Sequence, residues 1–249
     1  MSSRSFAAGL ALAVAITTAL TVAVRAPAAW VSDWLQSHGR LCFVDPRGTV
    51  WNGSALFGIS DGRQIMLVPG RVSWRIGWGQ IVSARILADV SHPALAAPIA
   101  VSFSGKSIAL KNGQAELPAA LLSALGVPFN TVRPGGVLAV SWTDIEIGEH
   151  RLAGDVRIDW RDAQSALSPV APLGSYRLEI AGMGDAVRLR LDTLRGPLRL
   201  QGSGTLKEGR LSFKGLASSE PEMRQALSGL IGVLGPRSGD DAILYIEKL

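Results

Sequence analysis

From Leu41 onward, apolar and polar residues alternate along the chain with a period of two. In residues 71–78, every second residue is valine, tryptophan or isoleucine, and arginine, serine or glycine fills the positions between them. Such alternation is typical of strands that bury one face. Further alternating segments occupy residues 82–90, 99–103, 107–110, 138–147, 151–160, 175–181, 187–191, 198–202, 210–217 and 242–247. Short strands separated by glycine-rich turns predict a mainly antiparallel all-β protein with a curved or half-barrel-like sheet.

Two short segments have a helical pattern instead. Residues 118–125 start with a proline and precede Gly126, and residues 222–234 follow Pro221 and precede Gly235. Proline near the start and glycine after the end are the usual signals of helix termini. We therefore predict two short helices that cap the sheet.

Two irregularities interrupt the alternation. The apolar positions shift by one residue at Ile145, which predicts a β-bulge near Thr143. Residues 162–173 fit neither period and contain several serines and prolines, which predicts a loop. This loop divides the β region into a front half, about 41–161, and a back half, about 174–249.

The N-terminus has a different pattern. Residues 6–24 form an unbroken run of uncharged, mostly apolar residues between Arg4 and Arg25. A membrane-spanning helix needs about 20 apolar residues. We predict a membrane anchor within residues 1–28 and, across residues 29–249, a β domain exported to a bacterial periplasm.

A cleaved signal peptide is the alternative, because Ala26-Pro27-Ala28 offers a small-residue cleavage pattern. The length of the apolar run favours an uncleaved anchor. Residues 28–36 predict a short helix after the span. Its Trp30 and Trp34 lie on one face, either at the level of the lipid headgroups or packed against the domain.

Composition and motifs narrow the possible functions. The net charge is +5, but the basic residues are scattered and form no stripe with aromatic residues, so nucleic acid is not an expected partner. Cys42 is the only cysteine and is expected to be a buried structural thiol. His38, His92 and His150 lack the spacing of metal ligands, and no nucleophile–base motif is present. We therefore predict no enzyme, no cofactor and no metal.

Residues 48–55, with the sequence Gly-Thr-Val-Trp-Asn-Gly-Ser-Ala, carry a recognisable motif. The motif resembles the G-T-[VL]-W-x-G-x-A signature of protein N of the type II secretion system. The matching residues are Gly48, Thr49, Trp51, Gly53 and Ala55. Similar blocks follow in the family's order at residues 117–122, 134–138, 174–178, 196–204 and 211–217. Lys207 departs from the family, which often carries an aromatic residue there.

This resemblance implies a single-pass inner-membrane protein with a periplasmic domain. It implies an accessory role, without catalysis, in the machine that moves folded proteins across the outer membrane. The implied partners are other type II secretion subunits, with membrane lipid contacted by the anchor. For Trp51 and Gly53 we expect structural roles, with the indole packed over a hairpin and the glycine permitting a tight turn at Asn52-Gly53.

A second hypothesis is a periplasmic carrier of lipid or lipoprotein. A long alternating sheet with an apolar face can hold acyl chains. Trp74, Trp78 and Trp142 are the candidate residues of such an apolar groove. Ordinary core packing is the alternative interpretation, because most apolar residues in strands are buried.

Overall fold

The computed structural model of the chain describes residues 17, 21–22, 24–38, 41–60, 65–77, 85–105, 107–126, 129–148 and 151–248. The strands are β1 (Leu41–Gly48), β2 (Asn52–Ser60), β3 (Ile65–Ile76), β4 (Arg85–Ser91), β5 (Ile99–Ser104), β6 (Ser107–Leu110), β7 (Gly113–Pro118), β8 (Pro134–Ile147), β9 (Leu152–Ser165), β10 (Gly174–Gly184), β11 (Ala186–Arg195), β12 (Leu198–Lys207), β13 (Arg210–Ser219), β14 (Arg237–Ser238) and β15 (Asp241–Lys248). The helices are α2 (Ala29–His38), α3 (Phe129–Val132) and α4 (Arg224–Leu234), with 3₁₀ turns η2 (Ala119–Leu125) and η3 (Pro221–Met223).

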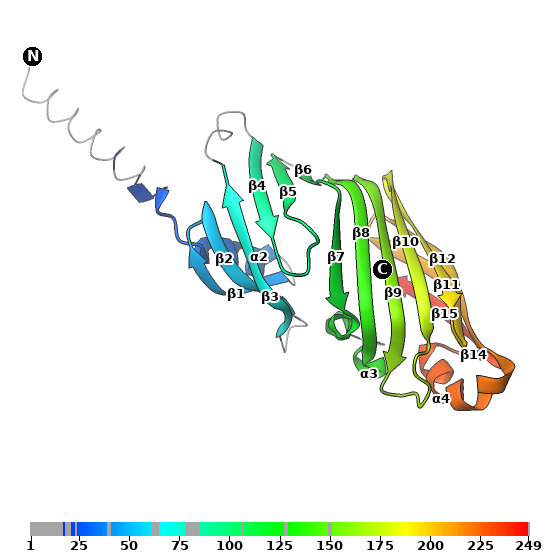
Figure 1. Cartoon of the computed structure of the whole chain (residues 1–249). Coiled ribbons are helices and arrows are strands. Elements are labelled where there is room, and N and C mark those ends of the chain that lie inside the picture. The colour runs from blue at the N-terminus through cyan, green and yellow to red at the C-terminus, as the bar shows by residue number, and fades with distance from the viewer. Residues whose placement is uncertain are drawn as a thin grey trace, which may run out of the picture.

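These strands form one antiparallel sheet that is not closed into a barrel (Figure 1). Strands lie beside each other in chain order, except that β6 and β7 both pair with β8 and that β15 precedes β14. The antiparallel all-β prediction is confirmed. Both predicted capping helices are also present, the first as the 3₁₀ turn η2, which ends at Gly126 with a φ of 86°, and the second as α4.

Of the two irregularities predicted in the alternating pattern, the bulge is confirmed and the loop is partly wrong. The bulge near Thr143 is confirmed, because the four residues of β8 from Thr143 to Glu146 oppose only three residues of β9, Ala153 to Asp155. The loop predicted for residues 162–173 is wrong at its start. There β9 continues to Ser165, and Asp162, with a φ of 47°, interrupts the alternation inside the strand. Because β9 pairs directly with β10, one sheet runs through both halves.

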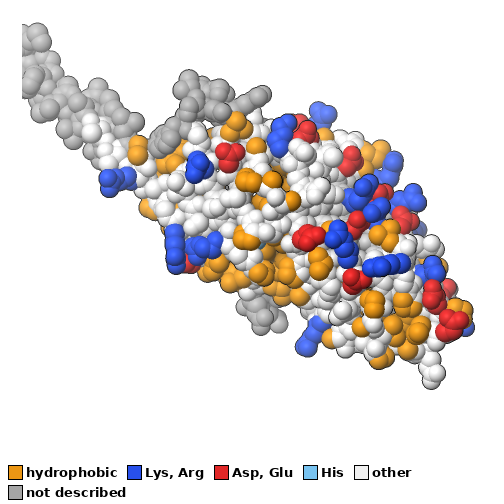
Figure 2. All heavy atoms as spheres, in the orientation of Figure 1, with side chains coloured by type: hydrophobic (Ala, Val, Ile, Leu, Met, Phe, Trp, Pro, Cys, Tyr) orange, Lys and Arg blue, Asp and Glu red, His pale blue; other side chains and the backbone are white. Residues whose placement is uncertain are grey.

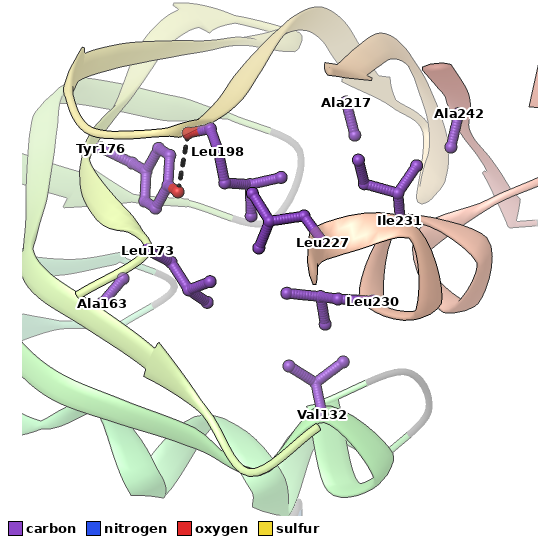
Figure 3. Packing of buried hydrophobic residues seen from close by; sticks show 10 residues of the cluster. All are labelled: Val132, Ala163, Leu173, Tyr176, Leu198, Ala217, Leu227, Leu230, Ile231 and Ala242. Atoms are coloured by element: carbon purple, nitrogen blue, oxygen red, sulfur yellow. Dashed lines mark hydrogen bonds between the residues drawn. The ribbon is translucent and has the colours of Figure 1, made fainter. Parts of the chain in front are cut away.

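The C-terminal part of the sheet curves around its end helices. Val132 of α3, Leu230 of α4 and Ala242 of β15 belong to one buried cluster (Figure 3). Strand β15 lies six strands from β8, which directly follows α3, so a flat sheet would separate these residues by roughly 29 Å. Helix α4 lies between α3 and β15 in this cluster, and the sheet bends around these helices (Figure 3).

A second cluster lies at the N-terminal end of the sheet. Trp74 and Ala55 are buried in it, and the ring of Phe43 stacks on Trp74 with centroids 5.3 Å apart. Helix α2 packs beside β1, and the hydroxyl of Ser32 donates to the carbonyl of Phe43 at 2.7 Å. This bond occupies a carbonyl on the edge strand, where unpaired backbone groups invite association with other chains.

The predicted membrane anchor lies almost entirely outside the described residues. Of the helices that the structure describes, none has the length and apolar character needed to cross a membrane. The span at residues 6–24 stays a prediction. The short helix expected after it is confirmed as α2, in which Trp30 is 54% exposed; the side chain of Trp34 is outside the description.

Candidate functional site

The two faces of strands β8–β12 differ in chemistry. On one face, Val140, Ile158, Leu178 and Leu191 are successive cross-strand partners from β8 to β11. On the other face, Arg side chains and Asp or Glu side chains stand on β9, β10 and β11, and Figure 2 shows charges gathered over this part of the sheet. We call the first surface the apolar face; it comprises Leu138, Val140, Trp142, Val156, Ile158, Trp160, Leu178, Ile180, Leu189, Leu191, Leu200 and Leu206.

Helices cover one end of the apolar face. Helix α4 packs on β13 and β15 and buries Leu227, Leu230 and Ile231 to 2% exposure or less (Figure 3). Further along the strands, Ile158, Leu178 and Leu189 remain only half-buried. Monomeric soluble proteins rarely expose contiguous apolar patches beyond a few hundred Å². The half-buried part of the apolar face, which α4 does not cover completely, is the leading candidate for a contact site.

The opposite face is held together by ion pairs. Arg177 binds Asp159 with two hydrogen bonds of 2.7 and 2.8 Å, and this pairing lowers the pKa of the Asp159 carboxyl. Arg157 lies 3.4 Å from Glu179 on the same strands. These charges already satisfy one another across β9 and β10, which makes this part of the face a solvated outer surface.

The residues of the 48–55 motif form a turn and the start of a strand. Gly48 ends β1 with a φ of 85°, a conformation that favours glycine. The side chain of Thr49 accepts a hydrogen bond from the amide of Asn52 at 3.1 Å. Ala55 is fully buried. The motif therefore builds the first hairpin of the sheet.

The predicted turn at Asn52-Gly53 is wrong in position. Gly53 lies within β2 opposite Gly48, so the turn comprises residues 49–52. A Cβ on Gly53 would lie 2.5 Å from Cζ2 of Trp74. This glycine thus makes room for a neighbouring indole, while Gly48 adopts the left-handed conformation. Trp51 is half-buried, and its carbonyl accepts a hydrogen bond from the amide of Ile76 at 2.7 Å.

Trp74 and Trp142, two of the three candidate groove tryptophans, lie in different parts of the sheet. Trp74 is 7% exposed and belongs to the N-terminal cluster. Trp142 lies on β8, four strands away, or roughly 19 Å along the sheet. Trp142 is part of the apolar face, and Trp78 is outside the described residues. Sequence reasoning missed the aliphatic residues of β9–β11, which form most of that face.

The other candidate features of the described structure are its hollows and the residues that could bind a metal or titrate. Across its residues, no three His, Cys, Asp or Glu side chains lie close enough to hold a metal. Cys42 is buried, as expected of a structural thiol, and burial raises its pKa. A hollow of about 750 Å³ lies where Ala96–Pro98 faces β7–β10. Its lining includes Arg157 and Glu179, which pair with each other.

His92 stabilises the loop between β4 and β5. Its Nδ1 accepts a hydrogen bond from the amide of Ala94 at 3.0 Å, so the proton of the neutral ring is on Nε2. Burial lowers the pKa of His92, because it disfavours the charged ring. His92 therefore acts as a neutral structural group. The side chains of His38 and His150 are outside the description.

Together, the fold and its surfaces define a protein built on one open antiparallel sheet with a charged outer face and a partly uncovered apolar face. A family model described as type II secretion system (T2SS), protein N, matches residues 39–244. Since this match covers most of the chain, the chain belongs to that family and is a type II secretion component. The resemblance seen at residues 48–55 is thereby confirmed. No curated protein and no solved structure matches the chain.

Proposed function

We propose that this protein is a non-enzymatic accessory component of the type II secretion machinery. It is anchored in the inner membrane by residues 6–24, and its β domain lies in the periplasm. There it contacts other secretion subunits. The apolar run between Arg4 and Arg25 supports the anchor, because its length suits a bilayer.

The half-buried part of the apolar face is the observation that carries this proposal. Ile158 and Leu178 lie at its centre, only half-buried, on strands paired on both sides. Burial of apolar surface contributes roughly 25 cal/mol per Å², so covering these side chains favours association. A partner subunit that presents its own apolar residues matches this surface.

Site-specific photo-crosslinking in intact membranes tests the contact. The reactive group replaces Ile158 in one variant and Arg157 in another, because these neighbours lie on opposite faces of β9. We expect adducts with secretion subunits from position 158 and few or none from position 157. Equal adducts from both positions, or none from position 158, would contradict the proposed surface.

A second candidate function, a lipid or lipoprotein carrier, uses the same face. The observation that favours it is the unequal burial of the face. Helix α4 covers one end of the face, while Ile158 and Leu178 remain half-buried. A lipid could lay its acyl chains against the aliphatic side chains. Mass spectrometry of lipids co-purified with the full chain tests this function. Lipid that is retained by the wild type and lost in Leu178→Asn supports a carrier, whereas recovery of secretion subunits without lipid supports the assembly role.

A further inference from the structure

The charged side of the sheet contains a second, smaller hollow at strands β11–β13. Its volume is about 360 Å³, and it is lined by Arg188, Ser203, Gly204, Thr205, Ser212 and Lys214. The hollow lies on the side of the sheet opposite the apolar face, because Arg188 alternates along β11 with Leu189. The hollow forms because short hydroxyl side chains lie between two long basic side chains.

The strand register places the basic residues on opposite sides of the hydroxyl groups. Arg188 pairs with Thr205, which pairs with Ser212. In the next row of this face, Ser203 pairs with Lys214. Directly opposed residues have Cβ atoms about 5 Å apart, and β11 and β13 are separated by about 10 Å. The two basic side chains can therefore reach one small ligand held between them.

Neither Arg188 nor Lys214 forms an ion pair with a carboxylate side chain that the structure describes. The basic neighbours differ in this respect, because Arg190 binds Asp192 at 2.8 Å and Lys207 lies 3.5 Å from Asp185. Arg188 and Lys214 make no such ion pair with the side chains that the structure describes, which do not include Glu247, the partner of Ser212 on β15. The lining of the hollow includes no acidic residue. Two basic side chains beside three hydroxyl groups favour the binding of an anion.

We infer that this hollow binds a phosphate group, either as free phosphate or as the headgroup of a phosphorylated lipid. A phosphate offers several oxygens in a tetrahedral arrangement. It can accept hydrogen bonds from the guanidinium of Arg188, the ammonium of Lys214 and the hydroxyls between them at the same time. A carboxylate has two oxygens and would leave part of this donor set unused. The inference does not depend on the secretion role proposed above.

Phosphorus NMR on the purified full-length chain in neutral detergent tests the site. One titration uses inorganic phosphate, and another uses glycerol 3-phosphate, the soluble headgroup of phosphatidic acid, both at constant ionic strength. We expect saturable line broadening, with Arg188→Gln and Lys214→Gln each weakening binding about tenfold. The matched control is Arg210→Gln, which removes one positive charge from the same hairpin outside the hollow. It should weaken binding less than about twofold.

Comparing the affinities of the two ligands shows whether the site prefers free phosphate or a lipid headgroup. Tighter binding of glycerol 3-phosphate supports a lipid headgroup, and inorganic phosphate binding at least as tightly supports the free anion. Lack of saturable binding to either ligand overturns the inference. An equal loss in Arg210→Gln also overturns it, because the effect would then be one of overall charge. A melting temperature equal to that of the wild type shows that each variant retains the fold.

Discussion

The indole ring of Trp74 lies across Gly53, its direct cross-strand partner, and its Nε1 donates a 2.9 Å hydrogen bond to the carbonyl of Val50. Trp142 has the same relationship to Gly113, and its Nε1 donates to the carbonyl of Lys111 at 2.8 Å. In both pairs a glycine inside a strand leaves space that a facing indole fills. These glycines are needed for packing.

Replacing Gly53 with alanine should destabilise the protein. The new Cβ would meet Cζ2 of Trp74 at 2.5 Å and the carbonyl of Thr49 at 2.7 Å, and backbone cannot move aside cheaply. We expect a loss of about 1–3 kcal/mol in the free energy of unfolding, measured by urea denaturation. Gly229→Ala is the control, because this exposed position in α4 has no atom near the added methyl. It should stabilise the protein by about 0.5–1 kcal/mol.

The Gly113–Trp142 pair should show strong coupling in a double-mutant cycle. Gly113→Ala places a methyl group against the indole and should be destabilising in the wild-type background. In a Trp142→Ala background the same substitution should cost much less, since the clashing ring is gone. We expect a coupling energy of roughly 1–2 kcal/mol from paired denaturation curves. Additive effects would show that the glycine is required for another reason.

These aromatic pairs explain where sequence reasoning succeeded and where it failed. The period of two revealed most strands, because each of them buries one face. It misplaced the first turn, because Asn52-Gly53 is a strong local hairpin signal. The real reason for a glycine at position 53 is the indole of Trp74, which lies on a later strand opposite it. Strand β7 was not predicted, since Gly113–Pro118 is defined by its pairing with β8.

From the sequence, an apolar sheet face could be predicted, but not which residues form its partly exposed area. Trp142 lies on the apolar face, whereas Trp74 is buried in the N-terminal cluster, and an apolar groove at these residues stays a prediction. The choice between them depends on which strands α2 and α4 cover, and this is a tertiary property. The hollow at Arg188 and Lys214 was also not apparent, because its residues come together only through the register of three strands.

Stability should fall in mild acid because of His92. Burial holds its folded pKa below the unfolded value of about 6.5, so the unfolded chain binds more protons near that pH. The resulting penalty is absent above the unfolded pKa and grows as the pH falls through it toward the lower folded pKa. We expect a lower melting temperature at pH 5 than at about pH 7.

The variant His92→Asn isolates this contribution to the pH dependence. Its side-chain oxygen can still accept the hydrogen bond from the amide of Ala94, but it does not titrate. The melting temperature of this variant should therefore vary less between these two pH values. An unchanged slope would assign the pH dependence to other groups.

The two ion pairs on the outer face should differ in strength. Asp159 is 21% exposed and accepts two short hydrogen bonds from Arg177, so Asp159→Asn should cost about 1 kcal/mol. Glu179 is 44% exposed and lies 3.4 Å from Arg157. Its replacement by Gln should change stability by less than about 0.5 kcal/mol. Chemical denaturation of both variants at low and high salt checks the ranking.

The order of the strands also determines how the protein can be assembled. Nearly every strand pairs with its neighbour in sequence, so each hairpin can close across a short loop as soon as its second strand is available. Val132 is different, because its packing partners on α4 appear only after residue 224. A chain delivered from its N-terminus could therefore build an open sheet first and acquire its curvature last. Until α4 docks, the widest apolar surface of the molecule would be accessible to partners.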